Sequence, residues 1–302
     1  RCLWAVPVVS NEIMDKKVFT VSENDAGSRL DAFLARALSC GVRGAKRLIE
    51  GGFVLVNNKT RPAQYKLTAD AMVAVATVNT PASSLAESVR LVAANDEYAT
   101  FFKPAGLHTV HVSGGDGESL ERILAQKWPE ISASLPNAPF PRLLTRLDKP
   151  TSGLVAAAFS AAAGERFRRF ETEGQVNKRY LAVVRGELDA PFTVENELDT
   201  DNRKKTRVRE TFCADFSRHT GVTPLRPLTL PAAGEIAATL VEARIKRGAR
   251  HQIRAHLAHA GFPILGDTLY GSPEDTLPLF LHHGDLALPG FSAVCPPSWF
   301  PI

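Results

Sequence analysis

Short strand-like segments fill most of the chain after residue 89, and only three helical patterns interrupt them. The predicted strands are residues 89–93, 98–103, 141–148, 154–160, 179–185, 193–198, 207–216 and 237–245. The predicted helices are residues 119–128, a stretch with Phe167 and Phe170 on its inner face, and residues 251–260. Strands that outnumber irregularly spaced helices are typical of an α+β fold with a mixed, largely antiparallel sheet, rather than of regular βαβ alternation.

A smaller unit with two short helices precedes this region. Ser28 stands where an N-cap would precede the apolar positions of one helical face over residues 30–38, and a second helix is predicted over residues 43–50. A strand-like segment and a turn signal at Asn57 and Asn58 follow. We predict a small α/β module over residues 18–78, a polar linker over residues 79–88 and a main domain over residues 89–302.

Composition excludes several classes of protein. With 44% hydrophobic and 23% charged residues, the chain resembles a folded globular protein rather than a disordered polymer. No apolar run approaches the roughly 18 residues that a membrane span needs, so we expect no membrane partner. The four cysteines are scattered without CxxC spacing, which argues against a disulfide framework or a zinc knuckle. A reducing compartment, the cytoplasm, fits this pattern best.

Positive charge is concentrated in three segments. The formal net charge is only +4, yet residues 28–66 hold eight Lys and Arg against two acids, and residues 201–210 and 242–254 are also strongly cationic. Clustered cations release counterions when they bind a phosphate backbone, so RNA is an expected partner. The alternative is that these segments are ordinary solvated surfaces.

Residues 143–154, LLTRLDKPTSGL, place an acidic side chain between two apolar segments. Asp148 is expected at the end of a strand, where a rigid element would present its carboxylate to a cleft. Arg146 lies two residues earlier and, on an extended strand, would face the same side. These residues alone leave two roles open for Asp148: a catalytic carboxylate, or a cap of the turn through Thr151 or Ser152.

Four ordered motifs resemble those of one enzyme family. Residues 143–154 are similar to the R-L-D-x-x-T-S-G signature of the RluA-type pseudouridine synthases. The other three motifs are FKPAGL at residues 102–107, NKRYLAVVRG at residues 177–186, and GARHQIRAHL with GFPILGDTLYG within residues 248–271. The N-terminal unit resembles the alpha-L RNA-binding module that this family often carries. The resemblance implies a monomeric enzyme without metal or organic cofactor that isomerises uridines in structured RNA, most often ribosomal RNA and next transfer RNA.

The resemblance also assigns chemistry to three side chains. Conversion of uridine to pseudouridine breaks the bond between N1 and the ribose and rejoins the base through C5. A carboxylate suits this centre as nucleophile or base, as in glycosidases, and we assign that role to Asp148. Arg254 would pair with the ionised Asp148, and the alternative is that it only binds phosphate. Tyr180 would pack against the uracil and relay the proton that leaves C5, and the alternative is that it is an ordinary core residue of a strand.

Further contacts with RNA are expected from cationic side chains. These are Arg146, Arg29, Arg43, Lys46, Arg47, Lys103, Arg250 and His251. Arg146 would fill the place of the everted base or hold a phosphate. We expect no metal site, because His251, His256 and His259 share a predicted helix but no Cys or carboxylate falls at partner spacing.

Two other functions stay open at this point. Thr145 stands where the family usually has His, and Ala249 where it usually has a basic residue, so a noncatalytic RNA-binding or ribosome-assembly factor with the same fold is one alternative. The intact Asp148 and Tyr180 argue against it. A glycosidase or nucleoside hydrolase built on Asp148 would need a second acid close by, and the flanking sequence supplies none.

Overall fold

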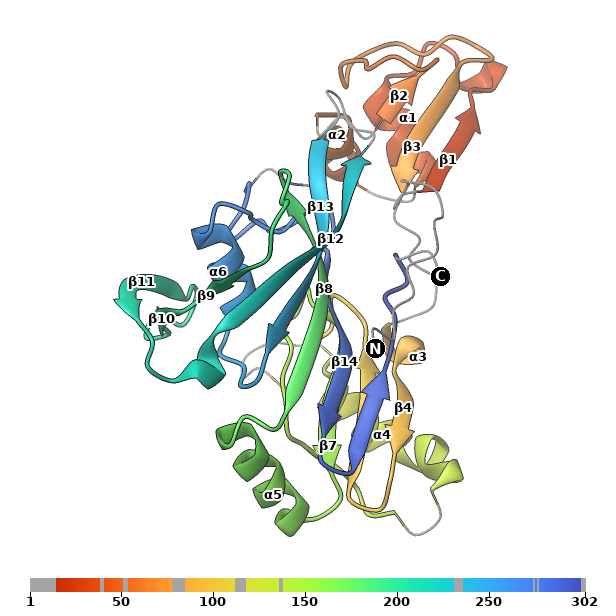
Figure 1. The fold of residues 1–302 in the computed structure, drawn as a ribbon. Helices are drawn as coiled ribbons and strands as arrows, with labels where there is room; N and C mark the ends of the chain where they lie inside the picture. The colour runs from red at the N-terminus through yellow and green to blue at the C-terminus, as the bar shows by residue number, and fades with distance from the viewer. Residues whose placement is uncertain are drawn as a thin grey trace.

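Figure 1 shows the computed structural model, in which residues 15–38, 41–50, 54–77, 85–111, 118–135, 138–230, 236–273, 275 and 277–299 are described. A three-stranded sheet forms a small unit at one end, and a ten-stranded sheet forms the main domain. Among the described strands of the main sheet, only β7 (Ser152–Ala158) and β14 (Leu281–Leu288) pair in parallel. The predicted α+β class with a mixed, largely antiparallel sheet is confirmed.

The N-terminal unit packs two helices on its small sheet. Its elements are β1 (Asp15–Thr20), η1 (Glu23–Asp25), α1 (Leu30–Ala37), α2 (Val42–Glu50), β2 (Val54–Val56) and β3 (Met72–Thr77). Both helices lie where the apolar spacing predicts them. Leu30 and Leu34 of α1 are buried in one cluster with Ala45 of α2 and Val73 of β3, so the apolar stripe is the face that packs.

The short helix α3 (Leu85–Ser88) lies at the end of the predicted linker. Residues 79–84 of that linker lie outside the described residues, and the domain bounds therefore stay predictions.

The main sheet has the strand order β4-β5-β7-β14-β8-β13-β12-β9, with β6 paired to β7 and β15 paired to β14. Its strands are β4 (Arg90–Ala94), β5 (Tyr98–Lys103), β6 (Arg142–Leu143), β7 (Ser152–Ala158), β8 (Asn177–Arg185), β9 (Phe192–Val194), β12 (Thr220–Leu230), β13 (Ile236–Ile245), β14 (Leu281–Leu288) and β15 (Phe291–Val294). A separate hairpin joins β10 (Asn196–Asp199) to β11 (Arg207–Phe212) and stands out from the sheet in Figure 1.

Three longer helices cover the main sheet. They are α4 (Leu120–Ile131), α5 (Ala161–Thr172) and α6 (Gln252–His259). The short 3-10 turn η2 (Ser132–Ser134) follows α4, and η3 (Phe216–Arg218) lies between β11 and β12. Leu124 of α4 and Leu257 of α6 belong to the largest buried apolar cluster. Phe167 of α5 is buried in another cluster, with Phe170 partly buried beside it, as predicted. No helix in the described ranges is long and apolar enough to cross a membrane.

Three strands of the main sheet, β12, β14 and β15, lie outside the predicted strands, and the first two were missed for clear physical reasons. β14 lies at the centre of the sheet, yet its residues His282, His283 and Asp285 are buried and polar, so they give no apolar pattern. The strand β12 contains Pro224 and Pro227, which normally indicate a loop. Both are tolerated because β9 pairs with β12 only as far as Val222, which leaves the outer edge of β12 unpaired beyond it.

Candidate active site

Asp148 lies in the loop between β6 and β7, and hydrogen bonds hold this loop on both sides of it. Thr109 Oγ1 donates to the carbonyl oxygen of Leu147 (2.8 Å) and accepts from its N–H (3.0 Å). The carbonyl oxygen of Lys149 accepts from the N–H of Gly106 (2.8 Å). The prediction that Asp148 ends a strand is wrong, because regular pairing stops at Leu143. Arg146 is therefore not on an extended strand with Asp148, although both line the same pocket.

The carboxyl group of Asp148 does not cap the turn. Its Oδ2 accepts from Nη1 of Arg254 (2.9 Å). Ser152 Oγ bonds Nδ1 of His282 instead (2.8 Å), and Thr151 Oγ1 has no partner among the described residues. The prediction that the Asp148 side chain caps the turn through Thr151 or Ser152 is thus wrong. The turn is instead closed by a backbone hydrogen bond from the N–H of Thr151 to the carbonyl oxygen of Asp148.

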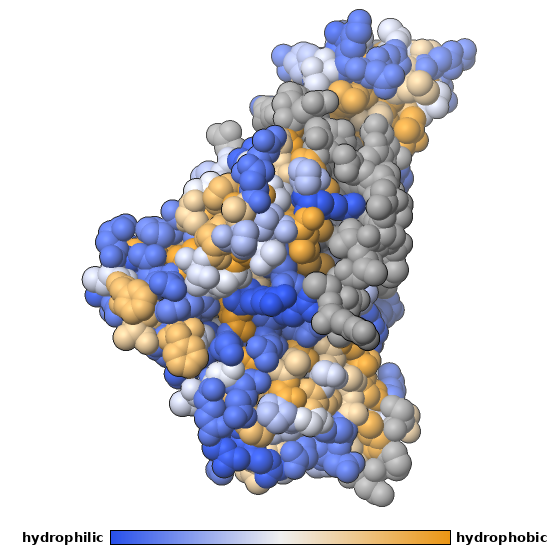
Figure 2. Space-filling model, viewed as in Figure 1, coloured by the Kyte–Doolittle hydropathy of each residue, from blue (hydrophilic) through white to orange (hydrophobic). Residues whose placement is uncertain are grey.

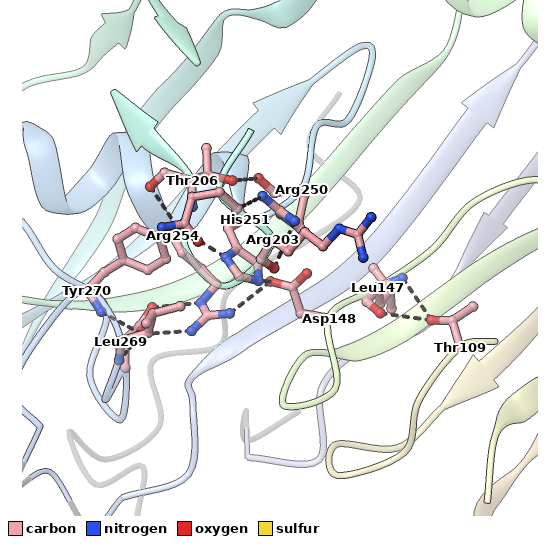
Figure 3. Close-up of polar contacts among 12 residues, drawn as sticks. Thr109, Leu147, Asp148, Arg203, Thr206, Arg250, His251, Arg254, Leu269 and Tyr270 are labelled. Atoms are coloured by element: carbon pink, nitrogen blue, oxygen red, sulfur yellow. Dashed lines mark hydrogen bonds and ion pairs between the residues drawn. The ribbon is translucent and has the colours of Figure 1, made fainter. Parts of the chain in front are cut away.

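Asp148, Arg254 and Asp267 form a charged cluster that crosses from the pocket into the interior. Arg254, on α6, donates from Nε and Nη2 to the two carboxylate oxygens of Asp267, both at 2.8 Å. The Asp267 side chain is 0% exposed, that of Arg254 7% and that of Asp148 20%. Asp267 therefore anchors the guanidinium from the buried side, and Asp148 is the most exposed member of the cluster. Figure 3 shows the guanidinium of Arg254 next to the carboxylate of Asp148.

The electrostatics of this cluster keep both buried groups charged. Burial alone would raise the pKa of the Asp267 carboxyl, but the hydrogen bonds and charge of Arg254, with the N–H groups of Tyr270 and Leu269, hold it below its usual value. Burial opposes the charge of Arg254, yet the hydrogen bonds and charges of Asp267 and Asp148 raise its pKa. A permanent cation is therefore fixed beside Asp148.

His251 and Tyr270 form the wall next to this cluster. His251 Nε2 lies 3.8 Å from Oδ2 of Asp148, and its Nδ1 lies 3.1 Å from the hydroxyl of Tyr270. His251 has a left-handed backbone with a φ of 56°, directly before α6. The Tyr270 hydroxyl donates to the carbonyl of Thr206 (2.9 Å) and accepts from its N–H (2.8 Å). Burial lowers the pKa of His251, with the charge of Asp148 acting against that shift.

Tyr180, on β8, lines the same pocket from the sheet. Its side chain is largely buried, and burial together with the charges of Asp148 and Glu171 raises the pKa of its hydroxyl. The structure thus brings together Asp148, Arg254, Tyr180 and His251, which the sequence places more than a hundred residues apart at the extremes.

The pocket has a volume of about 600 Å³ and a cationic lining. Its cationic side chains are Arg146, Lys149, Lys178, Arg203, Arg250 and Arg254. Arg146 and Lys149 are exposed, so they stand where a polyanion can reach them.

The other predicted RNA contacts lie in different surroundings. Arg250 is turned toward the protein, where its guanidinium donates to the carbonyl oxygens of Thr200 (2.7 Å), Arg203 (2.9 Å) and Asn202. In the N-terminal unit, Arg29 pairs with Asp31 and Lys46 is exposed, while the side chains of Arg43 and Arg47 lie outside the described part. The surface of this unit in Figure 2 is mainly hydrophilic.

Lys103 is not placed to contact RNA. Its side chain is fully buried, and Nζ donates to the carbonyl oxygens of Pro104 (2.9 Å), Leu107 (2.8 Å) and Lys149 (3.3 Å). Burial lowers the pKa of Lys103 to about 7, against the opposing charge of Asp148. The prediction of an RNA contact is wrong for this conformation, because Lys103 holds together the two loops that frame Asp148.

Two acidic residues near the site, Asp267 and Glu171, were not predicted from the sequence. Asp267 lies within the quoted GFPILGDTLYG segment, so that motif was the signal that could have found it. Glu171, at the end of α5, lines the pocket and pairs with the buried Lys178. A second carboxylate is therefore present, although no spacing in the sequence indicated it. Among the described residues, no three His, Cys, Asp or Glu side chains gather as metal ligands.

The two residues that depart from the resembled motifs serve the local structure. Thr145 Oγ1 accepts from the N–H of Ala156 (2.9 Å), and the N–H of Ala249 donates to the side-chain oxygen of Gln252 (2.9 Å). Neither residue interrupts the Asp148–Arg254–Asp267 cluster.

Comparison with protein families gives two matches. Residues 97–259 match the family described as RNA pseudouridylate synthase, and residues 28–73 match the S4 domain. The first match contains Asp148, Tyr180 and Arg254.

Comparison with curated proteins and solved structures agrees with this result. The ribosomal large subunit pseudouridine synthase D of Neisseria meningitidis serogroup A is 31% identical, covering 88% of this chain and 69% of the relative. The ribosomal large subunit pseudouridine synthase C of Pasteurella multocida is 32% identical, covering 84% of this chain and 78% of the relative. The solved structure of human RNA Pseudouridylate Synthase Domain Containing 1 shares the fold, with a TM-score of 0.54 and 22% identity over 72% of this chain and 86% of that one.

Proposed function

This chain belongs to the RNA pseudouridylate synthase family, and we propose that it isomerises uridines of large-subunit ribosomal RNA with Asp148 as its catalytic carboxylate. The observation that carries the assignment of Asp148 is the Asp148–Arg254–Asp267 cluster. In it, a buried guanidinium fixes one carboxylate while leaving it open to a cationic pocket. The choice of ribosomal RNA follows the names of the two bacterial relatives.

The chemistry needs no co-reactant. The bond between N1 and C1′ breaks, a bond between C5 and C1′ forms, C5 loses a proton and N1 gains one. Asp148 acts on the ribose, as nucleophile at C1′ or as base at C2′. Arg254 orients the carboxylate through a charge-assisted hydrogen bond from its Nη1 to Oδ2 of Asp148 (2.9 Å).

Tyr180 completes the site from the sheet side. Burial raises the pKa of its hydroxyl, which therefore stays protonated at neutral pH. It packs against the uracil, and its hydroxyl relays the C5 proton by accepting it while its own proton passes to water in the pocket.

The target nucleotide has to leave its helix before it can enter. The carboxyl of Asp148 is only 20% exposed and lies inside the pocket, where a stacked base cannot reach it. We assign Arg146, which is exposed at this pocket, to hold the flanking phosphate or to occupy the vacated stack.

The S4 domain match supports a second RNA contact through the N-terminal unit, which carries Arg29 and Lys46. We propose that the unit tethers the enzyme through phosphate contacts, which supply affinity without sequence selection. A monomer acting in the cytoplasm, where ribosomal RNA is assembled, completes the proposal.

The proposal is tested by mapping pseudouridine across total RNA in cells with and without this protein. The expected result is the loss of one or more sites in large-subunit ribosomal RNA, restored by the wild-type chain and by an Asp189→Asn control, which changes an exposed acid outside the pocket. Loss confined to transfer RNA would overturn the substrate assignment, and an unchanged map would overturn the function.

A further inference from the structure

Tyr180 has a stacking partner that no part of the mechanism above uses. Tyr180 of β8 and His283 of β14 are direct cross-strand partners in the antiparallel pairing of these central strands. Their rings are stacked, with centroids 4.4 Å apart and planes inclined by 13°. His283 is 1% exposed and lies behind Tyr180, outside the pocket lining. It therefore touches the reaction only through Tyr180.

The orientation of Tyr180 depends on its ring rather than on its hydroxyl. Within the described residues, the hydroxyl makes no hydrogen bond to the protein, although the other buried tyrosine of the sheet, Tyr98, donates to the carbonyl of Ala163 (3.1 Å). A tyrosine whose hydroxyl is free for substrate is oriented by what packs on its faces. The face of Tyr180 packs on His283.

His283 is itself held rigidly. Its Nδ1 donates to the carbonyl oxygen of Leu154 on β7 (2.6 Å), which fixes the ring plane and leaves Nε2 without a hydrogen-bond partner in the described part of the chain. The backbone of His283 lies so close to Gly153 that a Cβ there would be 2.3 Å from the His283 carbonyl oxygen. The glycine at position 153 thus allows the backbone of His283 to lie against β7, and a larger residue there would displace it.

We propose that His283 is a positioning residue that holds the Tyr180 ring at the angle required beside Asp148. The role rests on the proposed function, since it concerns the orientation of a group in that reaction. Burial lowers the pKa of His283 to about 3, so the imidazole is neutral throughout the working range and acts by shape, not by charge.

Three substitutions separate stacking from simple structural support. His283→Phe keeps an aromatic ring but loses the hydrogen bond to Leu154. His283→Asn keeps a donor for Leu154 but loses the ring, and His283→Ala loses both. Turnover and KM on the mapped ribosomal RNA substrate are measured for each variant, together with its thermal midpoint.

We expect kcat to fall about 2- to 10-fold in the Ala and Asn variants, the size of one lost aromatic stacking contact. KM should change less than about 2-fold, because most affinity for RNA comes from phosphate contacts. The Phe variant should retain nearly wild-type kcat even if its thermal midpoint is lower. An active Asn variant with an impaired Phe variant would overturn the proposal, as would wild-type kcat in the Ala variant.

A double-mutant cycle gives a second test that tolerates changes in stability. If His283 acts through Tyr180, His283→Ala should cause no further loss of kcat in a Tyr180→Ala background. Additive losses would overturn the positioning role. Absence of product from the wild-type enzyme would instead refute the proposed function, so the two failures are distinguishable.

Discussion

Replacing Arg254 by Met tests the energetics of the charged cluster. The substitution removes three hydrogen bonds to carboxylates and leaves Asp267, whose side chain is 0% exposed, without its cation. Breaking a buried pair in this way costs about 3–5 kcal/mol of unfolding free energy. Urea denaturation of the main domain at pH 7 measures the loss. Arg209→Met is the matched control, because its pair with Asp199 is at the surface and its loss should cost less than about 1 kcal/mol.

The pH dependence of this deficit has a definite sign. In the wild type, the pKa of Asp267 lies below its usual value, so its contribution is complete at pH 5–7 and is lost only as the pH falls through the folded pKa. In Arg254→Met, burial without a cation raises that pKa, so the folded variant binds protons more readily than its unfolded chain. The deficit should therefore shrink as the pH falls from 7 to 5. A deficit below 1 kcal/mol, or one independent of pH, would refute the reasoning.

Three more perturbations follow from the geometry. Gly153→Ala should lower the unfolding free energy by about 3–5 kcal/mol in chemical denaturation, because the φ of Gly153 is +118° and a Cβ there would meet the His283 backbone. The control Gly221→Ala should be nearly neutral, since the space around that position is open. Lys103→Met should lower the unfolding free energy by about 1–3 kcal/mol and reduce turnover, since three carbonyls around the Asp148 loop lose their donor. Unaffected turnover would contradict the role of Lys103 in supporting this loop. Replacing the exposed Lys46 and Lys59 together by Ala should weaken RNA binding. In a salt titration, the slope of log K against log[salt] should become shallower by up to about 0.9 per lost phosphate contact. An unchanged slope would count against RNA binding by the N-terminal unit.

The sequence predicted those parts of the fold whose burial follows a simple period. The stripe of α1 and the placement of Phe167 on α5 are of this kind, since one apolar face packs and the other is solvated. The central strand β14 could not be found in this way, because His282 and His283 are buried through specific partners: Ser152 and the Cys295 carbonyl for His282, and the Leu154 carbonyl for His283. Such partners exist only once β7 and β14 are side by side.

The same distinction holds for the site: residues within sequence motifs were predicted, and residues placed by tertiary contacts were not. The motifs indicated Asp148, Tyr180 and Arg254, and the structure brings these three to one pocket. For the other cationic residues, positive charge alone did not indicate whether the side chain points to solvent or into the protein. Lys103 and Arg250 are both drawn inward by backbone carbonyls of neighbouring loops, and no local pattern reveals where those loops will lie.

Release of tritium from C5 of uridine decides whether Asp148 performs the reaction, because the C5 proton leaves only when the base has been rejoined to the ribose. Ribosomal RNA labelled at C5 is incubated with wild type, Asp148→Asn and Asp189→Asn, and RNA affinity is measured in parallel. Wild type and Asp189→Asn should release tritium, whereas Asp148→Asn should match the protein-free background while binding RNA within about 3-fold of wild type, since phosphate contacts supply most of the affinity. Tritium release by Asp148→Asn at a rate comparable to wild type would show that this carboxylate is not the catalyst.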